Sequence, residues 1–588
     1  MYLSKLTISN FRRIKNATFE FVEGLNVIVG ANNIGKTALI DALRSLLASH
    51  EDPYLRITEN DIHKPKDGSL PAGDITFEFV FSGLNESDEA DFLHALVPVD
   101  DNEFQAHFGV RFSKIDVSGR MRIKRWCGEQ EDTAMTSDML ENLRGVYLQP
   151  LRDASQGLKP GRNSQLARLM RLLGENDKES VEGLIRAFEK LLKRRAPFLS
   201  TDQAITARHN EMLGDHLAQA LQLGVSGTDF KALSSKLSIS TDGMDVDSNG
   251  LGFNNLIFMA VVLSEMIKDP TAAYRGLIIE EPEAHLHPQL QVVLLEYLQG
   301  IKAADQEGSV QLFVTSHSPN FASLAELKSL VCLVEREDKI SCFSPRKIKF
   351  SDSKADHEKR VKKLERYLDA TKAELFFARK LILVEGAAEL MLVNVIAKRL
   401  GYDLKKEAVS IISVDGLNFD CFLPLMGEGK LNIPVSVLTD ADPSTKDPNN
   451  NKKTIALYPA LDDQLVISDN TSLLKGYEDS LVKVFHGIKT FEYDLAIHEE
   501  NIDVMLSGLS EIHPQIAISL KDEVKLKTNA QEKAKALFCG MFERGSGKTN
   551  VQKGRFSQEL AYQLTVDDVN FKVPQYLEDA IRHVCEAG

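Results

Sequence analysis

LILVEGAAELMLV, residues 381–393, is the stretch from which the organisation of this chain is best read. Its apolar start, residues 381–384, has the character of a buried strand, and the residues after Gly386 have helical spacing. Glu385 then stands at the exit of the strand, and Glu389 follows four residues later. Because residues four apart share one face of a helix, we expect Glu389 to point back toward Glu385. The stretch predicts a strand–turn–helix unit with two carboxylates at its turn.

A second apolar run, residues 435–439, ends in Asp440-Ala441-Asp442. Parallel strands carry their ligands at a shared carboxyl edge, where four acidic side chains would repel one another unless a cation lies between them. Oxygen ligands of this kind suit Mg²⁺ or Mn²⁺. Either acidic cluster alone is equally well read as a solvated loop. Their order and spacing together favour a metal site built from Glu385, Glu389, Asp440 and Asp442.

The composition limits the class of protein. With 588 residues the chain is too long for one core, and we expect two to four domains. No apolar run approaches the roughly 20 residues that span a bilayer, and the N-terminus lacks a signal-peptide block, so we expect no membrane contact. Six cysteines without a CxxC pair argue against a zinc ribbon or disulfide framework and favour the cytoplasm. The net charge of −15 excludes a non-specific nucleic-acid coat protein, so DNA would bind through local basic patches and metal ions.

The N-terminal segment carries a phosphate-binding pattern. Short strands are expected at residues 2–8, 18–21 and 25–29, and the last leads into GANNIGKT, residues 30–37, and then a helix. Backbone N–H groups of a GxxxxGK[ST] loop wrap a phosphate chain, the lysine adds positive charge, and the hydroxyl binds Mg²⁺. A Gly-Lys turn without a ligand is the alternative, but the flanking strand and helix favour a nucleotide site.

Two further loops are consistent with that site. An apolar strand at residues 146–148 ends at Gln149, a residue type that can bind Mg²⁺ or position water. The glycine-rich loop SNGLG, residues 248–252, precedes an apolar helix, whose N-terminus is suited to a γ-phosphate. Each of these signals is weak alone.

Two later strands deliver acidic and basic groups. The apolar run 276–279 ends in Glu280 and Glu281, which supplies one acid for the Mg²⁺ shell and one to polarise water. A strand at residues 310–314 ends close to His317, which is placed to sense a γ-phosphate. This half of the chain therefore has the ordered parts of an ATPase.

Residues 155–240 interrupt that order with amphipathic stretches at 166–175, 180–195 and 215–224. Helices inserted into a nucleotide-binding fold either pair with a partner chain or pack as a cap. A basic cluster within them is a solvated helix end or a DNA-backbone contact: Lys190, Lys193, Arg194 and Arg195.

The order of these motifs resembles the ABC-type ATPases of the structural-maintenance and recombination-repair group. The resemblance implies that ATP lies between two heads, so a homodimer is expected. Glu280 stands where that group has Asp, and the signature departs from LSGGQ, so hydrolysis is expected to be slow or partner-dependent. Glu281 would be the catalytic glutamate. The other implied nucleotide-site residues are Arg12, Gly30, Asn32, Asn33, Gly35, Lys36, Thr37, Gln149, Ser248, Gly250, Glu280 and His317.

The C-terminal acids resemble those of a Toprim domain. An ATPase head followed by Toprim is similar to the OLD (overcoming lysogenisation defect) family of ATPase–nucleases, which includes Gabija-type nuclease subunits. The resemblance implies that Glu492, with Thr490, completes a second metal site. It also implies that Lys553, in a KxRF segment, neutralises charge at the scissile phosphate. An exposed loop lysine is the alternative for Lys553.

The predicted fold class is α/β: an ABC-type P-loop ATPase head with a helical insertion, followed by a C-terminal Toprim domain. The expected parts are a first ATPase segment, a helical dimerisation insertion, a second ATPase segment, a helical linker and the Toprim domain with helical additions, at residues 1–154, 155–240, 241–345, 346–376 and 377–588.

The function implied by the resemblance is an ATP-regulated, Mg²⁺- or Mn²⁺-dependent DNA endonuclease in anti-phage defence or DNA processing. Its partners would be DNA, a second copy or a tetramer, and in some family members a helicase-like protein. An ATP-gated scaffold without catalysis is one alternative. A topoisomerase- or primase-like enzyme is another; a topoisomerase would need a nucleophilic tyrosine beside the acids, and Tyr458, Tyr477 and Tyr493 stand in no recognisable motif of that kind.

Overall fold

The structure is a computed structural model of the chain. It describes residues 1–588 except 48–54, 66–67, 101–102, 115–120, 150–156, 163, 218, 222, 224–228, 242, 269–271, 285, 302–308, 338, 448–449, 465, 567–569 and 588.

An antiparallel sheet begins the fold, in the order β2-β1-β4-β6-β5, with β7 paired to β6. Apolar residues alternate toward one face, so that Leu6 and Ile8 are buried while Lys5 is exposed. Strands β1 and β2 extend beyond the predicted ranges because their pairing continues to Phe11 and Ile14 at the turn. The strands are β1 (Tyr2–Phe11), β2 (Ile14–Glu20), β4 (Ile75–Ser82), β5 (Leu96–Asp100), β6 (Glu103–Lys114) and β7 (Met121–Cys127).

A second sheet, in the order β14-β13-β3-β12-β11-β8, lies beside it and is parallel except at β14. Strands β3, β11 and β12 are buried along their whole length, as central parallel strands usually are. Their carboxyl ends bring the P-loop, the Glu280–Glu281 pair and the His317 segment to one edge. The elements are β3 (Leu25–Val29), α1 (Lys36–Leu47), β8 (Leu143–Leu148), β11 (Tyr274–Glu280), α10 (Pro288–Gly300), β12 (Gln311–Thr315), α11 (Pro319–Leu324), β13 (Leu330–Arg336) and β14 (Lys339–Phe343).

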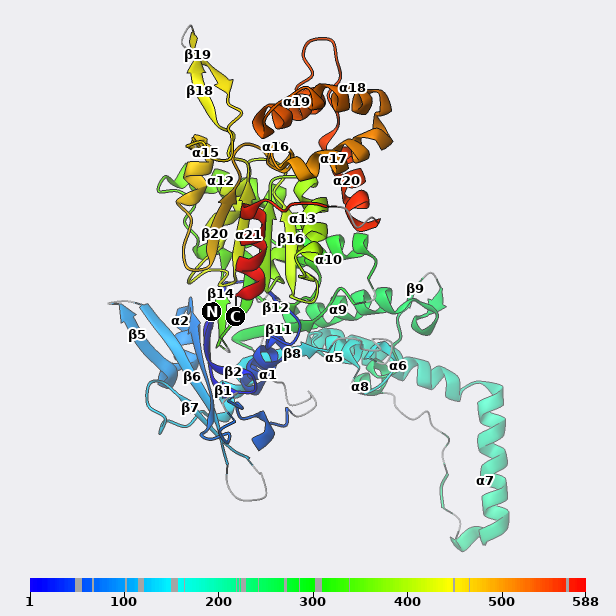
Figure 1. Cartoon of the computed structure of the whole chain (residues 1–588). Helices are drawn as coiled ribbons and strands as arrows, with labels where there is room; N and C mark the ends of the chain where they lie inside the picture. Colours follow the sequence, from blue (N-terminus) through cyan, green and yellow to red (C-terminus); the bar gives the residue numbers. More distant parts are fainter. Residues whose placement is uncertain are drawn as a thin grey trace.

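The helical insertion extends from this head, and α7 stands clear of the rest of the chain (Figure 1). Its helices are α5 (Gln165–Arg171), α6 (Glu175–Lys193), α7 (Ala196–Leu217) and α8 (Phe230–Ser234). The helix predicted at residues 215–224 is wrong, because α7 begins at Ala196, ends at Leu217, and residues 219–221 are not helical. Pro197 explains the earlier start, since proline favours the first turn of a helix.

Helix α9 (Leu251–Lys268) is the one described helix whose length and composition would allow it to cross a membrane. It packs against the ATPase sheet instead, with Phe258, Val262 and Met266 buried in the core. Its buried Glu265 pairs with Arg144 on β8 at 2.7 Å. This packing is that of a core helix in a globular domain.

The C-terminal sheet is fully parallel, in the order β16-β15-β17-β20. The hairpin β18–β19 and the helices α18 and α19 lie at the top of the view, beyond that sheet, with the hairpin on the left and the helices on the right (Figure 1). The elements are β15 (Lys380–Val384), α13 (Ala387–Arg399), β16 (Val409–Ser413), α14 (Phe419–Phe422), β17 (Val435–Thr439), β18 (Ser444–Asp447), β19 (Asn450–Ala456), α15 (Asp469–Lys475), β20 (Val482–His486), α16 (Phe491–Ala496), α17 (Glu499–Ile512), α18 (Pro514–Lys525), α19 (Ala530–Phe542), α20 (Lys553–Val566) and α21 (Gln575–Glu586).

One continuous apolar core joins the two halves of the molecule. It includes Val314 of the ATPase sheet, Leu364 of α12 (Lys354–Tyr367), and Leu383 and Val437 of the C-terminal sheet. The two sheets are therefore packed through shared buried side chains rather than connected by an exposed tether alone. The remaining short elements are α2 (Glu86–Asp91), α3 (Ser137–Asn142), β9 (Ser240–Thr241), β10 (Met244–Asp245) and 3₁₀ turns at Glu59–Asp61, Leu93–Ala95, Val246–Ser248, Leu327–Ser329, Pro345–Lys347, Lys372–Phe376 and Leu423–Leu425.

Candidate functional site

The P-loop has the strand–loop–helix form that its sequence predicts. Gly30 has φ 150°, and a Cβ there would lie 2.7 Å from the Leu333 carbonyl oxygen, so only glycine fits. The Lys36 ammonium donates to the carbonyls of Gly30 and, at 3.0 Å, Ala31. Burial lowers the pKa of Lys36 to about 8. Asn32, Asn33 and Thr37 are exposed along the loop, and Gly35 has φ 106°.

Glu280 and Glu281 have different surroundings at the end of β11. Glu280 is buried and accepts a hydrogen bond from the Tyr147 hydroxyl at 2.9 Å, and burial raises the pKa of its carboxyl. Glu281 has a left-handed backbone, φ 47°, which directs it toward His317 at 3.2 Å. Burial lowers the pKa of His317, and the charge of Lys36 lowers it further. Gln149 lines a small cavity with both glutamates. The acids, Gln149 and His317 therefore meet near the P-loop.

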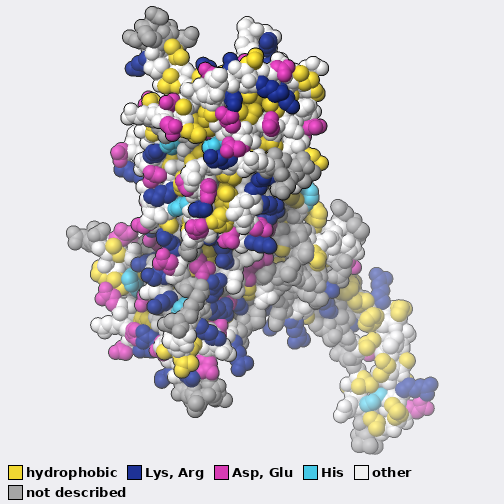
Figure 2. All heavy atoms as spheres, viewed as in Figure 1, with side chains coloured by type: hydrophobic (Ala, Val, Ile, Leu, Met, Phe, Trp, Pro, Cys, Tyr) yellow, Lys and Arg dark blue, Asp and Glu magenta, His cyan; other side chains and the backbone are white. Residues whose placement is uncertain are grey.

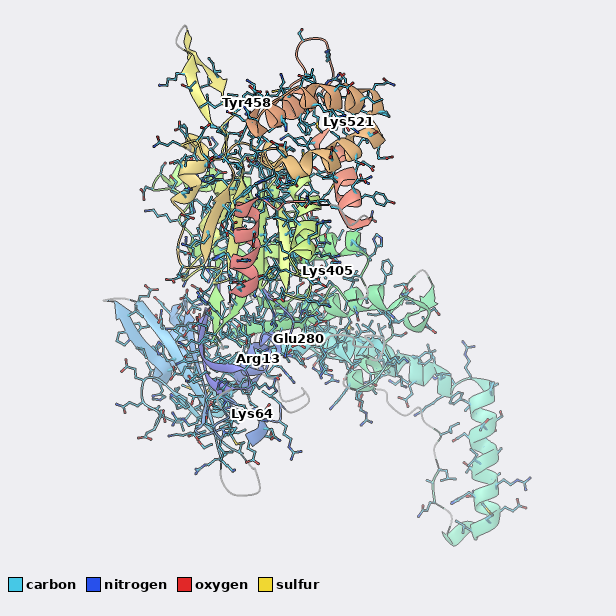
Figure 3. The ribbon with its side chains drawn as sticks, in the orientation of Figure 1. Arg13, Lys64, Glu280, Lys405, Tyr458 and Lys521 are labelled. Atoms are coloured by element: carbon cyan, nitrogen blue, oxygen red, sulfur yellow. The ribbon has the colours of Figure 1, made fainter. Side chains whose placement is uncertain are left out.

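Arg12 lies beside the P-loop helix and is held by two carboxylates. It donates to Asp41 at 2.7 Å and to Asp61 at 2.8 Å. Arg44 also bonds Asp41, at 2.9 Å, and its guanidinium lies 3.9 Å from the centroid of the Tyr147 ring. A chain of contacts thus connects Arg12 to the Tyr147 that holds Glu280. Arg12 also lines a cavity of about 280 Å³ together with residues that include Arg13, His63 and Lys64. Figure 3 shows Arg13 and Glu280 in this half of the molecule.

Ser248 ends the 3₁₀ turn Val246–Ser248, Gly250 directly precedes α9, and both are exposed. A Cβ on Gly250 would meet nothing within 4 Å. These two residues are therefore accessible to a second molecule.

The C-terminal acids lie at the carboxyl edge of the parallel sheet. Glu385 follows β15, and Glu389 accepts the backbone N–H of Gly386 at 3.0 Å, so it folds back toward the strand end. Asp440 follows β17 and accepts the backbone N–H of Phe491 at 2.9 Å. Asp442 is exposed, with a left-handed backbone of φ 41°.

Three residues from later helices complete this edge. Glu492 on α16 is almost fully buried, and the Lys553 ammonium at the start of α20 lies 2.8 Å from its carboxylate. Thr490 directly precedes α16 and is buried, and its side chain makes no capping hydrogen bond. Helix packing thus brings together side chains from segments more than 160 residues apart, since Lys553 lies 168 residues after Glu385.

The electrostatics show acids held close together. Burial raises the pKa of Glu389 to about 7, and the charges of Glu492 and Glu385 add to that increase. Burial also raises the pKa of Asp440, and the negative charge of Glu385 raises it further. Burial likewise raises the pKa of Glu385, with an added contribution from the charge of Asp442. Lys553 lowers the pKa of all three carboxyls. The single positive charge of Lys553 is therefore too small to balance the negative charge of these carboxylates.

The donor atoms fit a hard divalent cation. Buried oxygens without a hydrogen-bond or ion-pair partner include Glu385 Oε2, Thr490 Oγ1 and Glu492 Oε1, whereas Glu492 Oε2 pairs with Lys553. Carboxylates and a hydroxyl are the ligands that Mg²⁺ and Mn²⁺ prefer. Among the described residues, no three acidic, His or Cys side chains already surround one point as ligands, so cation binding would draw the carboxylates closer.

Sequence reasoning missed several residues that support these sites. Tyr147 donates a hydrogen bond to Glu280 and lies inside a predicted strand, but nothing in the sequence around it indicates that Glu280 is its partner. Asp494 is buried beside the C-terminal acids and accepts backbone N–H groups from residues 488 and 489. Burial raises the pKa of Asp494 to about 7. Its position two residues after Glu492 was the available clue.

Family models match both halves of the chain. One described as "AAA domain, putative AbiEii toxin, Type IV TA system" matches residues 25–323. One described as "Overcoming lysogenization defect protein-like, TOPRIM domain" matches residues 376–442. With the strand order, these matches confirm the predicted fold class, a P-loop ATPase head with a helical insertion followed by a Toprim domain.

The chain is similar to proteins with nuclease names. The "OLD nuclease" of Thermus scotoductus is 24% identical, over 70% of this chain and 77% of that protein. The "Endonuclease GajA" of Bacillus cereus strain HuB5-5 is 22% identical, over 99% of this chain and 98% of that protein. A structure of the C-terminal region of the Burkholderia pseudomallei OLD protein is 24% identical, covers 36% of this chain and 98% of that one, and has a TM-score of 0.24.

Proposed function

Because the chain belongs to the OLD family, in which an ATPase domain is joined to a Toprim domain, we propose that it is an ATP-regulated, divalent-metal-dependent DNA endonuclease. Its role would be in anti-phage defence or DNA processing. The observation that carries the proposal is the group of crowded, buried carboxylates opposite Lys553, whose raised pKa values and orphaned oxygens call for a cation. The nuclease names of two relatives support the same reaction class.

The proposed division of work follows from the positions of the side chains. Glu385, Glu389, Asp440 and Asp442 would hold divalent cations, with Glu492 and Thr490 at a second position. Bound divalent cations lower the pKa of water and stabilise charge on a leaving oxygen. Lys553 already faces the carboxylates, so its ammonium would lie against the scissile phosphate and reduce its negative charge.

In the ATPase half, the P-loop amides and Lys36 would hold the ATP phosphates, and Thr37 with Glu280 would hold the associated Mg²⁺. Glu281 would orient water, with His317 at 3.2 Å as its neighbour. The exposed Ser248 and Gly250 would contact ATP bound to a second head. This arrangement needs a dimer for full ATPase activity.

Contacts between the two halves support control of cleavage by ATP. Arg13 bonds the carbonyl of Asn33 in the P-loop and the carboxylate of Glu335 on β13. The next residue on β13, Arg336, donates to the Asn432 side chain at 3.2 Å. Asn432 immediately precedes the segment that leads into β17, whose end carries Asp440. A cavity of about 250 Å³ lies at this junction.

The insertion supports self-association. Leu184, Phe188 and Leu191 form one stripe on α6 and are 70%, 60% and 59% exposed. Figure 2 shows apolar side chains on the projecting arm that includes α7. We assign the exposed apolar stripe on α6, together with this arm, to contact with a second copy in a dimer or a tetramer. A helicase-like partner would bind elsewhere.

Two tyrosines near the acids argue against a topoisomerase. The Tyr493 hydroxyl is buried and donates to the Pro459 carbonyl at 2.9 Å. The Tyr458 hydroxyl bonds Glu543. Both hydroxyls are therefore engaged, whereas a topoisomerase needs a hydroxyl free to attack phosphate.

The experiment is cleavage of supercoiled plasmid by the purified chain with Mg²⁺, Mn²⁺ or Ca²⁺, each with and without ATP. We expect cleavage with Mg²⁺ or Mn²⁺, and a loss of about 100-fold or more in Asp440→Ala. Lys36→Ala should lose ATP binding and, with it, any effect of ATP on cleavage. Retained ATP binding by Asp440→Ala shows that this variant is folded. Wild-type cleavage by folded Asp440→Ala would refute the metal site, and a chain that binds ATP and DNA without cleaving would support the scaffold alternative.

A further inference from the structure

Asp494 is a buried carboxylate that the proposed reaction leaves without a task. It lies on α16, is 3% exposed, and occupies the inner side of the turn that precedes that helix. Its Oδ1 accepts the backbone N–H groups of Ile488 at 3.1 Å and Lys489 at 3.0 Å. One carboxylate oxygen therefore fixes two successive peptide groups between β20 and α16.

Gly487 makes this close approach possible. A Cβ at Gly487 would lie 1.7 Å from Asp494 Oδ2 and 2.9 Å from the Tyr576 ring. A side chain at this position would thus displace the carboxylate or the turn. The turn and the Asp494 carboxylate are packed directly against each other, so a displacement of one would displace the other.

The same turn also forms hydrogen bonds with the loop Asp440–Asp442. The Lys489 carbonyl accepts the N–H groups of Ala441 at 2.8 Å and Asp442 at 3.1 Å. Asp442 has φ 41°, a conformation that is uncommon for a residue other than glycine. The two hydrogen bonds hold this loop against the turn, and their acceptor belongs to a residue whose own N–H donates to Asp494.

The turn also leads directly into the other half of the site. Thr490 follows Lys489, and the N–H of Phe491 donates to Asp440 Oδ1 at 2.9 Å. A shift of the turn would therefore move Thr490 and Glu492 relative to Asp440 and Asp442. Each of these four residues is a proposed cation ligand.

We infer that Asp494 is a positioning residue, which rests on the proposed function: it holds the turn at residues 487–489 and thereby sets the distance between the ligands on β17 and those on α16. It acts as a hydrogen-bond acceptor for the backbone and does not bind the cation. Its negative charge is therefore dispensable, while its acceptor oxygen is required.

The test compares Asp494→Ala with Asp494→Asn, which keeps an acceptor oxygen and removes the charge. Asp494→Ala should lower kcat for plasmid cleavage by about 10–100-fold, as expected for ligand displacement of about 1 Å, and leave KM for DNA within about threefold. Asp494→Asn should retain cleavage at a rate within about fivefold of wild type. Hydrogen exchange should show faster exchange of the Ala441 and Asp442 amides in Asp494→Ala, but not in Asp494→Asn.

Asp479→Ala is the matched control, because Asp479 Oδ1 also accepts two successive backbone N–H groups, from Leu481 at 2.7 Å and Val482 at 2.8 Å. It should lose thermal stability and keep cleavage by the folded fraction. Asp494→Asn as inactive as Asp494→Ala would make Asp494 a ligand or proton carrier and overturn the inference, as would unchanged exchange at Ala441 and Asp442. If wild type itself fails to cleave, the proposed function falls, while the exchange measurement still decides the positioning role.

Discussion

Glu389 illustrates the chemistry of the site at the scale of one residue. Its carboxylate is buried among other acids, and its pKa is raised to about 7. Ionisation is therefore unfavourable in the folded protein until positive charge is nearby. A cation would supply that charge, so cation binding and ionisation of Glu389 should occur together.

The pH dependence follows with a definite sign. In the unfolded chain Glu389 ionises near its ordinary pKa, whereas the folded chain retains the proton up to about pH 7. Stability of the cation-free protein should therefore fall as pH rises between these values, by at most about 3 kcal/mol from this residue. Calorimetry in EDTA should show this slope reduced in Glu389→Gln. Added Mn²⁺ should stabilise wild type more at pH 8 than at pH 6. Equal slopes in both proteins would contradict the assignment.

Local spacing explains which site residues could be predicted. Glu385 and Glu389 belong to one strand–turn–helix unit, so a single stretch of sequence contains their geometry. The link from Tyr147 to Glu280 depends instead on β8 and β11 being neighbours, across 133 residues of sequence. The contact of Asp494 with the turn at residues 487–489 depends on tight packing around Gly487, which no periodicity encodes. The candidate ligands could therefore be predicted from the sequence, whereas the residues that position them, such as Tyr147 and Asp494, could not.

At the scale of elements, α6 and α7 differ from the other long helices of the described chain. The amphipathic pattern at residues 180–195 predicts α6, but none of the residues of α6 is buried. Amphipathic helices gain most of their stability from packing an apolar face. The missing packing surface is the physical basis for assigning the arm to a second copy.

Dimerisation should therefore depend on the α6 stripe. Leu184→Glu combined with Phe188→Glu should convert the dimer, or the tetramer, to smaller species in light scattering, because charge would have to be buried at the interface. Lys190→Glu, two residues after Phe188 and on another face of α6, is the matched control and should leave the mass unchanged. An unchanged mass in the double variant would show that the α6 stripe is not the interface.

At the scale of the whole molecule, one apolar core extends from the ATPase sheet into the Toprim sheet. In the proposed control by ATP, a change at the P-loop would reach the second sheet through these packed side chains and through the contacts of Arg13 and Arg336. The shared core lies between segments distant in sequence, so the order of the two domains could be predicted from motifs but their relative placement could not.

Breaking the junction should separate the two activities. Arg336→Ala removes the hydrogen bond to Asn432 and should reduce the effect of ATP on the cleavage rate by about fivefold or more, with ATP affinity unchanged. Arg346→Ala is the control, because Arg346 bonds the Glu20 carbonyl within the ATPase half. An undiminished ATP effect in Arg336→Ala would exclude this contact from the coupling.

The Mn²⁺ dependence of plasmid cleavage, measured side by side on wild type and Glu385→Gln, tests the central claim most directly. We expect wild type to cleave only with the cation and to stop in EDTA. Glu385→Gln should be about 100-fold slower or worse at every Mn²⁺ concentration while still binding ATP. Cleavage that persists in EDTA, or wild-type cleavage by Glu385→Gln, would contradict a metal-dependent nuclease site at the end of β15.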